Sequence, residues 1–401
     1  MGTILLLIIY LAFISLGLPD SLLGSAWPAM RPDLDAPLGT AGLLSMTVAV
    51  GTILSSLASG AVARRFGTGR VTLVSCFLTA TALFGYAYAP SIAWLILFAI
   101  PLGLGAGSVD ATLNHFVAAH YKAHHMSWLH CFWGVGATTG PMIMAAFLSG
   151  NGSWRHGYLT VAGIQSTLVI LLLLTLPLWK RPGAGEGVAT GSAKPAAAPS
   201  HGEGGRNSTK GVPYALASFL FYCGVEATVG LWGSSYLVNV KGLLAEDAAQ
   251  WVSLYYAGIT IGRFVTGFIT FKVSNRLLIR GGQITALAGT ILLLLPLPTG
   301  FSLVGLLVTG LGLAPIFPCM LHETPVRFGE AHAQRIMGYQ MAVAYTGTTL
   351  MPPLLGMLAG FATIGIFPPY VVLSAAAMLL VSERLNLLLD RRNRRNDATP
   401  A

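Results

Sequence analysis

The chain has 401 residues, of which 54% are hydrophobic and only 9% are charged, and its formal net charge is +9. A soluble globular domain carries roughly 25% charged residues, so this chain cannot cover its own surface with polar side chains. The composition excludes a soluble enzyme or binding domain and predicts an integral membrane protein. The four cysteines all lie in apolar stretches and are expected to be small buried side chains, not a disulfide framework.

Twelve apolar stretches are long enough to cross a bilayer, which needs about 20 residues for each crossing. The first has no basic residues before it and runs directly into Asp20, so we expect a spanning helix and not a cleaved signal peptide. The predicted spans are 3–26, 39–62, 70–89, 91–119, 127–149, 157–179, 213–238, 249–271, 277–297, 301–322, 335–360 and 366–388.

The lysines and arginines predict how the spans are oriented. One set of connecting loops, together with the C-terminal tail, holds 19 of the 23 basic residues. The opposite loops hold only Arg31, Arg155 and Lys241, and Arg263 lies inside a span. By the positive-inside rule, both termini are expected in the cytoplasm. The excess of positive charge is therefore a topology signal, and no nucleic-acid partner is needed to explain it.

Residues 181–211 are rich in Gly, Ala, Pro and Ser and predict a flexible cytoplasmic linker between two bundles of six helices. The expected division is an N-terminal bundle over 1–180, this linker, a C-terminal bundle over 212–390 and a basic cytoplasmic tail over 391–401.

The two halves repeat one another in sequence. The matches, at offsets of 206 to 211 residues, are Asp20 with Glu226, Gly103-Leu104-Gly105 with Gly310-Leu311-Gly312, and Gly136 before Pro141 with Gly347 before Pro352. Parallel six-helix halves that surround a central site are the plan of the major facilitator superfamily. The predicted fold is therefore an all-α membrane protein with twelve transmembrane helices in two six-helix bundles.

Within that superfamily the chain resembles the fucose–galactose–glucose–proton symporter family over all twelve spans. The segments that carry the resemblance are Asp20, Asp110-Ala111-Thr112-Leu113-Asn114, Leu129-His130-Cys131-Phe132 with Gly136-Ala137, Tyr222-Cys223-Gly224-Val225-Glu226 and Ile316-Phe317-Pro318. The resemblance implies proton coupling and sugar recognition by Asp20 and Asp110. The chain departs from the pattern at Pro19, at Trp133 and at Arg64, where the family or superfamily has asparagine, asparagine and aspartate.

Carboxyl groups inside the spans are the main functional signal. Asp20, Asp110 and Glu226 each lie in an apolar stretch, where an acid is costly unless it faces a water-filled cavity or a partner. We predict proton coupling at these three residues. The alternative for Asp110 is a structural hydrogen bond to a neighbouring helix. The alternative for Asp20 is a helix end that water reaches, next to the helix-breaking Pro19. The alternative for Glu226 is an ion pair with Arg263.

The predicted substrate-binding residues are polar or aromatic side chains of the spans. They are Asn114, four residues after Asp110 and so on one helix face, and His130, Trp133, Trp232, Gln340 and Tyr345. His130 has the alternative of a core-packing role, and Trp232 is the favoured sugar-stacking ring. Arg263 and Arg65 are assigned to a structural ion pair or to gating. His115, His120, His124 and His125 suggest a metal site, but those from His120 to His125 are expected in a solvated cytoplasmic loop without acidic or cysteine ligands, so no metal site is predicted.

These features predict a secondary transporter that takes up a neutral sugar or polyol with protons, or with sodium as coupling ion, by alternating access. The alternatives are a proton-driven exporter of drugs or amphiphiles and a nutrient sensor that does not transport. An enzyme is not expected, and the chain has no phosphate-binding loop for ATP-driven transport. We expect a monomer in a bacterial inner membrane, without cofactors.

Overall fold

The computed structural model describes residues 2–121, 123–149, 152–179, 211–270 and 272–397, and nearly all of them are helical. Within these residues, eleven helical segments are long and apolar enough to cross a membrane. Helix α14 has 32 residues and completes the twelve predicted crossings. The fold class predicted from the sequence is confirmed. In a bilayer this follows from backbone chemistry, because an α-helix satisfies its own N–H and C=O groups where no water is available.

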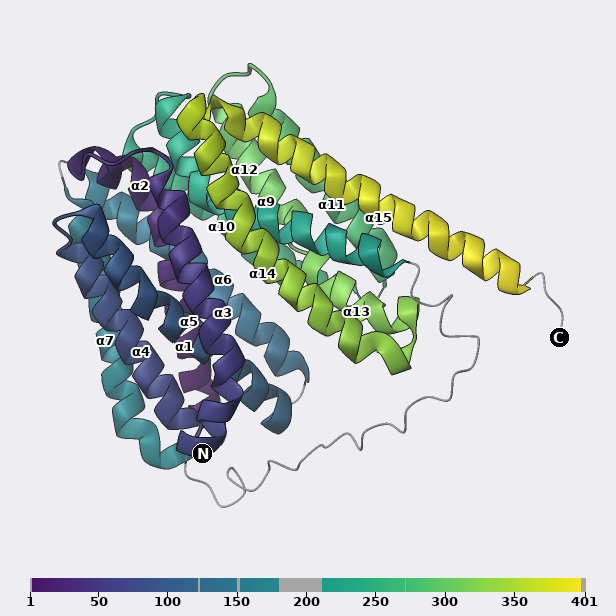
Figure 1. Cartoon of the computed structure of the whole chain (residues 1–401), viewed down its shortest axis with the longest axis horizontal. Coiled ribbons are helices and arrows are strands. Elements are labelled where there is room, and N and C mark those ends of the chain that lie inside the picture. Colours follow the sequence, from purple (N-terminus) through teal and green to yellow (C-terminus); the bar gives the residue numbers. More distant parts are fainter. Residues whose placement is uncertain (1, 122, 150–151, 180–210, 271, 398–401) are drawn as a thin grey trace.

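The helices of the first half precede residue 180 (Figure 1). They are α1 (Gly2–Asp20), α2 (Leu22–Asp33), α3 (Thr40–Phe66), α4 (Thr68–Ala87), α5 (Ile92–His120), α6 (Ala123–Leu148), α7 (Trp154–Thr175) and the short η2 (Leu176–Trp179). Those of the second half are α9 (Val212–Asn239), α10 (Ala245–Ile269), α11 (Asn275–Leu294), α12 (Gly300–Leu313), α13 (Ile316–Phe328), α14 (Glu330–Phe361), η3 (Ile364–Ile366) and α15 (Phe367–Asp397).

Two crossings are interrupted close to a proline. The first crossing breaks at Ser21 between α1 and α2, two residues after Pro19, as the sequence predicts. The tenth crossing breaks at Ala314-Pro315 between α12 and α13. Proline lacks the N–H of the helical ladder and its ring clashes with the preceding turn. The first of these breaks places the Asp20 carboxyl at a helix end in the middle of a crossing.

The repeated glycines pack in the same way in both halves. A Cβ on Gly136 of α6 would overlap the carbonyl oxygen of Ile14 on α1, and one on Gly347 of α14 would overlap that of Leu220 on α9. The fifth crossing therefore lies against the first in one half, as the eleventh lies against the seventh in the other. Gly103 and Gly310 show the same correspondence, because they meet the backbones of α3 and α10, the second and eighth crossings.

The two halves meet tightly at one end of the molecule and diverge towards the other (Figure 1). At the end called here the closed end, Gly24 of α2 touches the backbone of Gly230 on α9, and Gly42 of α3 touches Pro353 of α14. One cluster of buried hydrophobic side chains continues across both halves, with Trp27 and Trp232 fully buried. The opposite end, which carries the α3–α4 junction at Gly67, is called the open end.

Several predicted boundaries are wrong by more than a turn, because the helices run beyond the apolar stretches. His120 is the last residue of α5 and His125 lies in α6, so the predicted loop between them is only a short turn. The predicted tail continues as helix α15 to Asp397. Of the predicted linker, all but Gly211 lies outside the described residues, and the domain boundaries stay a prediction.

Candidate functional site

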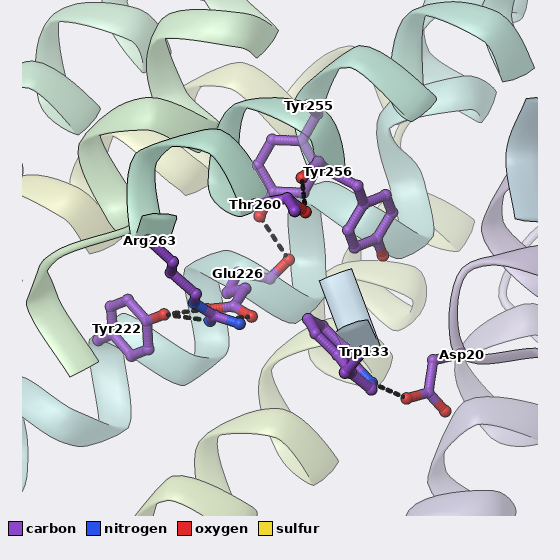
Figure 2. A network of polar contacts seen from close by, with 8 residues as sticks. All are labelled: Asp20, Trp133, Tyr222, Glu226, Tyr255, Tyr256, Thr260 and Arg263. Carbon is purple, nitrogen blue, oxygen red and sulfur yellow. Dashed lines mark hydrogen bonds and ion pairs between the residues drawn. The ribbon is translucent and has the colours of Figure 1, made fainter. Parts of the chain in front are cut away.

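A chain of polar contacts crosses the boundary between the two halves (Figure 2). On the first half, the indole N–H of Trp133 on α6 donates to Oδ2 of Asp20 at 2.8 Å. On the second half, the guanidinium carbon of Arg263 on α10 lies 5.4 Å from the centre of the Trp133 ring, within cation–π range. The Asp20 side chain is exposed and Trp133 is partly buried. The fold thus brings together residues that lie more than 240 positions apart in the sequence.

Arg263 is paired with Glu226, as one of the alternatives from the sequence predicts. Its Nη2 lies 3.3 Å from both carboxylate oxygens of Glu226 on α9, and the two side chains are 15% and 18% exposed. The hydroxyl of Tyr222, one turn before Glu226, donates to Oε2 of that carboxylate. Nη2 also contacts the Tyr222 hydroxyl at 3.2 Å. Every hydrogen bond that the guanidinium makes within the described residues uses Nη2, so Nε and Nη1 keep free N–H groups.

Asp110 forms a second polar group on α5. Oδ1 of Asp110 accepts a hydrogen bond from Nδ2 of Asn114 at 2.9 Å, the contact that a spacing of four residues on one helix face permits. The hydroxyl of Tyr345 on α14 lies within electrostatic range of the Asp110 carboxyl and contacts Ser56 of α3. Asp20 is also within electrostatic range of Asp110. The two carboxylates of the first half are therefore close enough to influence each other electrostatically.

His130 lies on α6, one turn before Trp133. Its side chain is exposed, its ring packs edge-on against Phe13 with centroids 6.1 Å apart, and it lies within electrostatic range of Arg263. No hydrogen bond of its ring is found within the described residues. An exposed histidine without such a bond is unlike a satisfied core residue, and it leaves both ring nitrogens available to a ligand.

Three predicted site residues lie elsewhere. Trp232 is fully buried at the closed end, where its Nε1 donates to the carbonyl of Pro352 at 2.8 Å, so no ring face is free to stack on a substrate. Gln340 is buried and accepts from Thr324 at 2.9 Å, which ties α14 to α13. Arg65 lies over the ring of its neighbour Phe66, 5.5 Å from the ring centre, and forms no salt bridge within the described part of the chain.

Two tyrosines of the network were not predicted as site residues. The hydroxyl of Tyr255 on α10 donates to the backbone carbonyl of Glu226 at 3.0 Å, and Tyr256 lies within electrostatic range of Asp20. Both precede Arg263 by about two helical turns and so share its helix face. That spacing is the sequence signal that could have identified them.

The site has an excess of negative charge. Asp20 and Asp110 form no salt bridge within the described residues, whereas the charge of Glu226 is balanced by Arg263. No group of three or more histidine, cysteine, aspartate or glutamate side chains suited to a metal ion occurs in the described ranges. Two pockets of about 260 and 310 Å³ are not lined by any residue of this polar network. The first is an apolar crevice between α1 and α7, and the second lies at the closed end. The site is therefore defined by its polar network.

The chain is similar to known transporters along most of its length. The model of the Major Facilitator Superfamily matches residues 9–352. "Bypass of stop codon protein 6" of Saccharomyces cerevisiae is 25% identical over 64% of this chain and 55% of its own length. The glucose/mannose transporter GlcP of Bacillus subtilis is 24% identical over 70% of each chain. The cis,cis-muconate transport protein of Acinetobacter baylyi is 23% identical over 92% of this chain and 89% of its own.

Solved structures share the fold. A crystal structure of a mutant of the nucleoside transporter NupG superposes with a TM-score of 0.75 at 14% sequence identity, covering 95% of this chain and 98% of that one. At this identity the likeness concerns the arrangement of the helices and not the substrate.

Proposed function

Because the chain belongs to the major facilitator superfamily and is a membrane transporter, we propose that it takes up a small neutral sugar or polyol together with protons. The two halves would rock around the central site and expose it to each side in turn. Asp20, Asp110 and Glu226 are the proposed proton-coupling residues. Asn114, His130, Trp133 and Tyr345 are the proposed substrate contacts.

The observation that carries this proposal is the charge balance of the site. The only guanidinium in the network is already paired with Glu226, while the Asp20 and Asp110 carboxyls have no basic partner within the described residues. Such a site favours protons or cations, and it repels an anionic substrate unless carboxyls are first protonated. This argues for a neutral solute, in line with the glucose/mannose relative and against a dicarboxylate such as muconate.

The hydrogen-bonding groups support a hydroxylated solute. Nε and Nη1 of Arg263 and the ring nitrogens of His130 have no hydrogen-bond partner among the described residues. Asn114 and Tyr345 lie beside the Asp110 carboxyl. The partly buried ring of Trp133 offers an apolar face for the C–H groups of a sugar. The resemblance to the fucose–galactose–glucose–proton symporters points the same way. A hydrophobic drug would leave these polar groups without hydrogen-bond partners, which disfavours the exporter alternative.

The positive-inside rule supports an orientation with the open end in the cytoplasm, which makes this an inward-open state. Two serines that begin helices without a side-chain cap are matched probes, Ser274 before α11 and Ser91 before α5. In right-side-out vesicles, a membrane-impermeant thiol reagent is expected to modify Ser91→Cys but not Ser274→Cys, beyond the labelling of the unaltered protein. Labelling of Ser274→Cys from outside would reverse the orientation.

The proposed function is tested with purified protein in a ligand panel. Monosaccharides, polyols, muconate and typical exporter drugs are each added, and thermal unfolding is measured. A true substrate is expected to stabilise the protein, by about 2.7 kcal/mol at a concentration 100 times its Kd. Uptake of the stabilising compound into proteoliposomes is then driven by a pH gradient or a sodium gradient. Stabilisation by muconate or drugs alone, or uptake without either gradient, would refute the proposal.

His130→Ala is expected to weaken binding of the sugar found in that panel by roughly 1–3 kcal/mol, the cost of leaving a buried polar partner unsatisfied. Folding should be nearly unaffected, because the exposed ring has no hydrogen bond to lose within the described residues. Thermal unfolding with and without sugar measures both quantities on one sample. Unchanged affinity with lower stability would show that His130 only packs against Phe13.

A further inference from the structure

The indole of Trp133 joins the two halves through two different interactions. Its N–H is bound to the Asp20 carboxylate on one side, and its ring lies under the Arg263 guanidinium on the other (Figure 2). Asp20 belongs to the first half and Arg263 to the second, so the ring occupies the space between an acid and a base that a substrate would also contact. Trp133 therefore contacts both groups at once.

The strength of both interactions depends on the charge of Asp20. A hydrogen bond to an ionised acceptor is about twice as strong as one between neutral groups. An ionised Asp20 also attracts the Arg263 cation on the far side of the ring, and this attraction disappears when the carboxyl takes up a proton. The ionised acid therefore holds the indole more strongly than the neutral acid does, and protonation makes the ring easier to displace.

We propose that Trp133 makes sugar binding depend on prior protonation of Asp20. While Asp20 is ionised, the indole stays fixed between Asp20 and Arg263 and a sugar must displace it. Once Asp20 is protonated, the ring is free to turn its face to the sugar, and the free N–H groups of Arg263 become accessible. The inference rests on the proposed symport and adds to it the side chain through which protonation of Asp20 controls access to the sugar site.

The other ionisable groups around Asp20 are few. Asp110 of α5 and Tyr256 of α10 lie within electrostatic range of it, and His130 and the Glu226–Arg263 pair lie beyond the indole. The ionisable groups of α2 and α7 lie near the closed end, at Arg31, Asp33, Arg155, His156 and Tyr158. Asp110 will titrate as well, so the test must isolate the part of the pH dependence of sugar binding that requires the indole N–H.

Trp133→Phe keeps an aromatic ring beside Arg263 but removes the N–H that donates to Asp20. In proteoliposomes the KM of the wild-type protein for sugar is expected to rise about fivefold between acidic and alkaline pH, the gap between a charge-assisted and a neutral hydrogen bond. In Trp133→Phe the rise should shrink to about twofold or less, whatever the substitution does to kcat and to the absolute value of KM. A merely structural tryptophan would alter both constants equally at every pH. An unchanged pH profile of KM would overturn the proposal.

Trp128→Phe is the matched control. Trp128 also lies on α6 and packs against α10, with its ring centroid 6.2 Å from that of Phe264, but it has no contact with Asp20. It should keep the wild-type pH profile. A loss of the profile in Trp128→Phe as well would assign the effect to general α6–α10 packing and overturn the proposal.

Indole fluorescence gives a second readout that needs no transport. The difference spectrum between wild type and Trp133→Phe should change with pH, and in an Asp20→Asn background that change should vanish. A Trp133 fluorescence signal that does not change with pH would overturn the inference even if uptake is proton-driven. A pH-dependent signal without proton-driven uptake would instead overturn the proposed function and leave a proton-sensing tryptophan.

Discussion

Asp110→Asn is expected to abolish accumulation of substrate against a gradient while leaving substrate exchange largely intact. Asparagine keeps the shape of the side chain and still accepts the hydrogen bond from Asn114, which spans 2.9 Å in the native site. It cannot take up or release a proton, so one step of the coupled cycle is blocked. Exchange does not require release of the proton and should continue. The accumulation ratio in proteoliposomes under an imposed pH gradient, together with counterflow at equal pH, measures the two activities separately.

Asp33→Asn is the control for that experiment. Asp33 is also an aspartate of the first half, but it lies at the closed end, where it pairs with Arg155 at 3.1 Å and accepts from Trp154 at 3.0 Å. Its loss should leave coupling unchanged. If Asp110→Asn still concentrates substrate, the coupling proton is carried elsewhere, and Asp20 and Glu226 become the residues to replace.

Arg263→Met is expected to destabilise the protein by about 3–5 kcal/mol, the usual effect of removing one partner from a buried ion pair. The loss would leave the Glu226 carboxylate, whose side chain is only 18% exposed, without its counter-charge. Adding Glu226→Gln should recover most of the stability, because the uncompensated charge is then gone. Transport should not recover, since the N–H groups that face the substrate are lost with the arginine. Thermal unfolding and uptake of the single and double variants test both statements.

Arg276→Met provides the comparison at an exposed pair. Arg276 binds Asp390 through two contacts of 2.6 and 2.7 Å, but the side chains are 48% and 39% exposed. Water screens such a pair, and its loss should cost only about 0–1 kcal/mol. An equal loss of stability in Arg276→Met and Arg263→Met would show that the burial of the Arg263 pair in the central site does not increase its contribution to stability.

Two parts of the site could be predicted from the sequence. One follows from the spacing of residues along a helix, and the other from the free-energy cost of a charge inside the membrane. Asp110 and Asn114 are four residues apart on one helix, and their hydrogen bond follows from helical geometry. Arg263 is the only basic residue deep inside a predicted span, away from its ends. The free-energy cost of an unpaired charge in hydrocarbon left few partners for it, of which Glu226 was one. Neither inference required knowledge of which helices touch.

Two predicted site residues lie outside the central network, because the exposure of a side chain is a property of helix packing. Trp232 and Gln340 lie in apolar spans at positions that suit a binding site, yet the close approach of α9 to α14 and of α13 to α14 buries them with partners of their own. Nothing in the sequence separates a tryptophan that faces a cavity from one that faces a proline carbonyl. Trp133 shows the converse, because its contacts with Asp20 and Arg263 are visible only once α6 lies between α1 and α10.

What the sequence alone determined is therefore the number of crossings, the repeat of the two halves, and the presence of costly acids within apolar helices. The first and the last follow from the low polarity of the bilayer core, which acts on every residue wherever its neighbours lie. The repeat is visible as glycines, prolines and acids that recur in register. Tertiary structure decided which of those side chains meet, since the halves touch at glycines such as Gly24, where backbones approach without side chains between them. The network from Asp20 through Trp133 to Arg263 forms because α6 of the first half packs against α10 of the second, with Gly134 against Thr260.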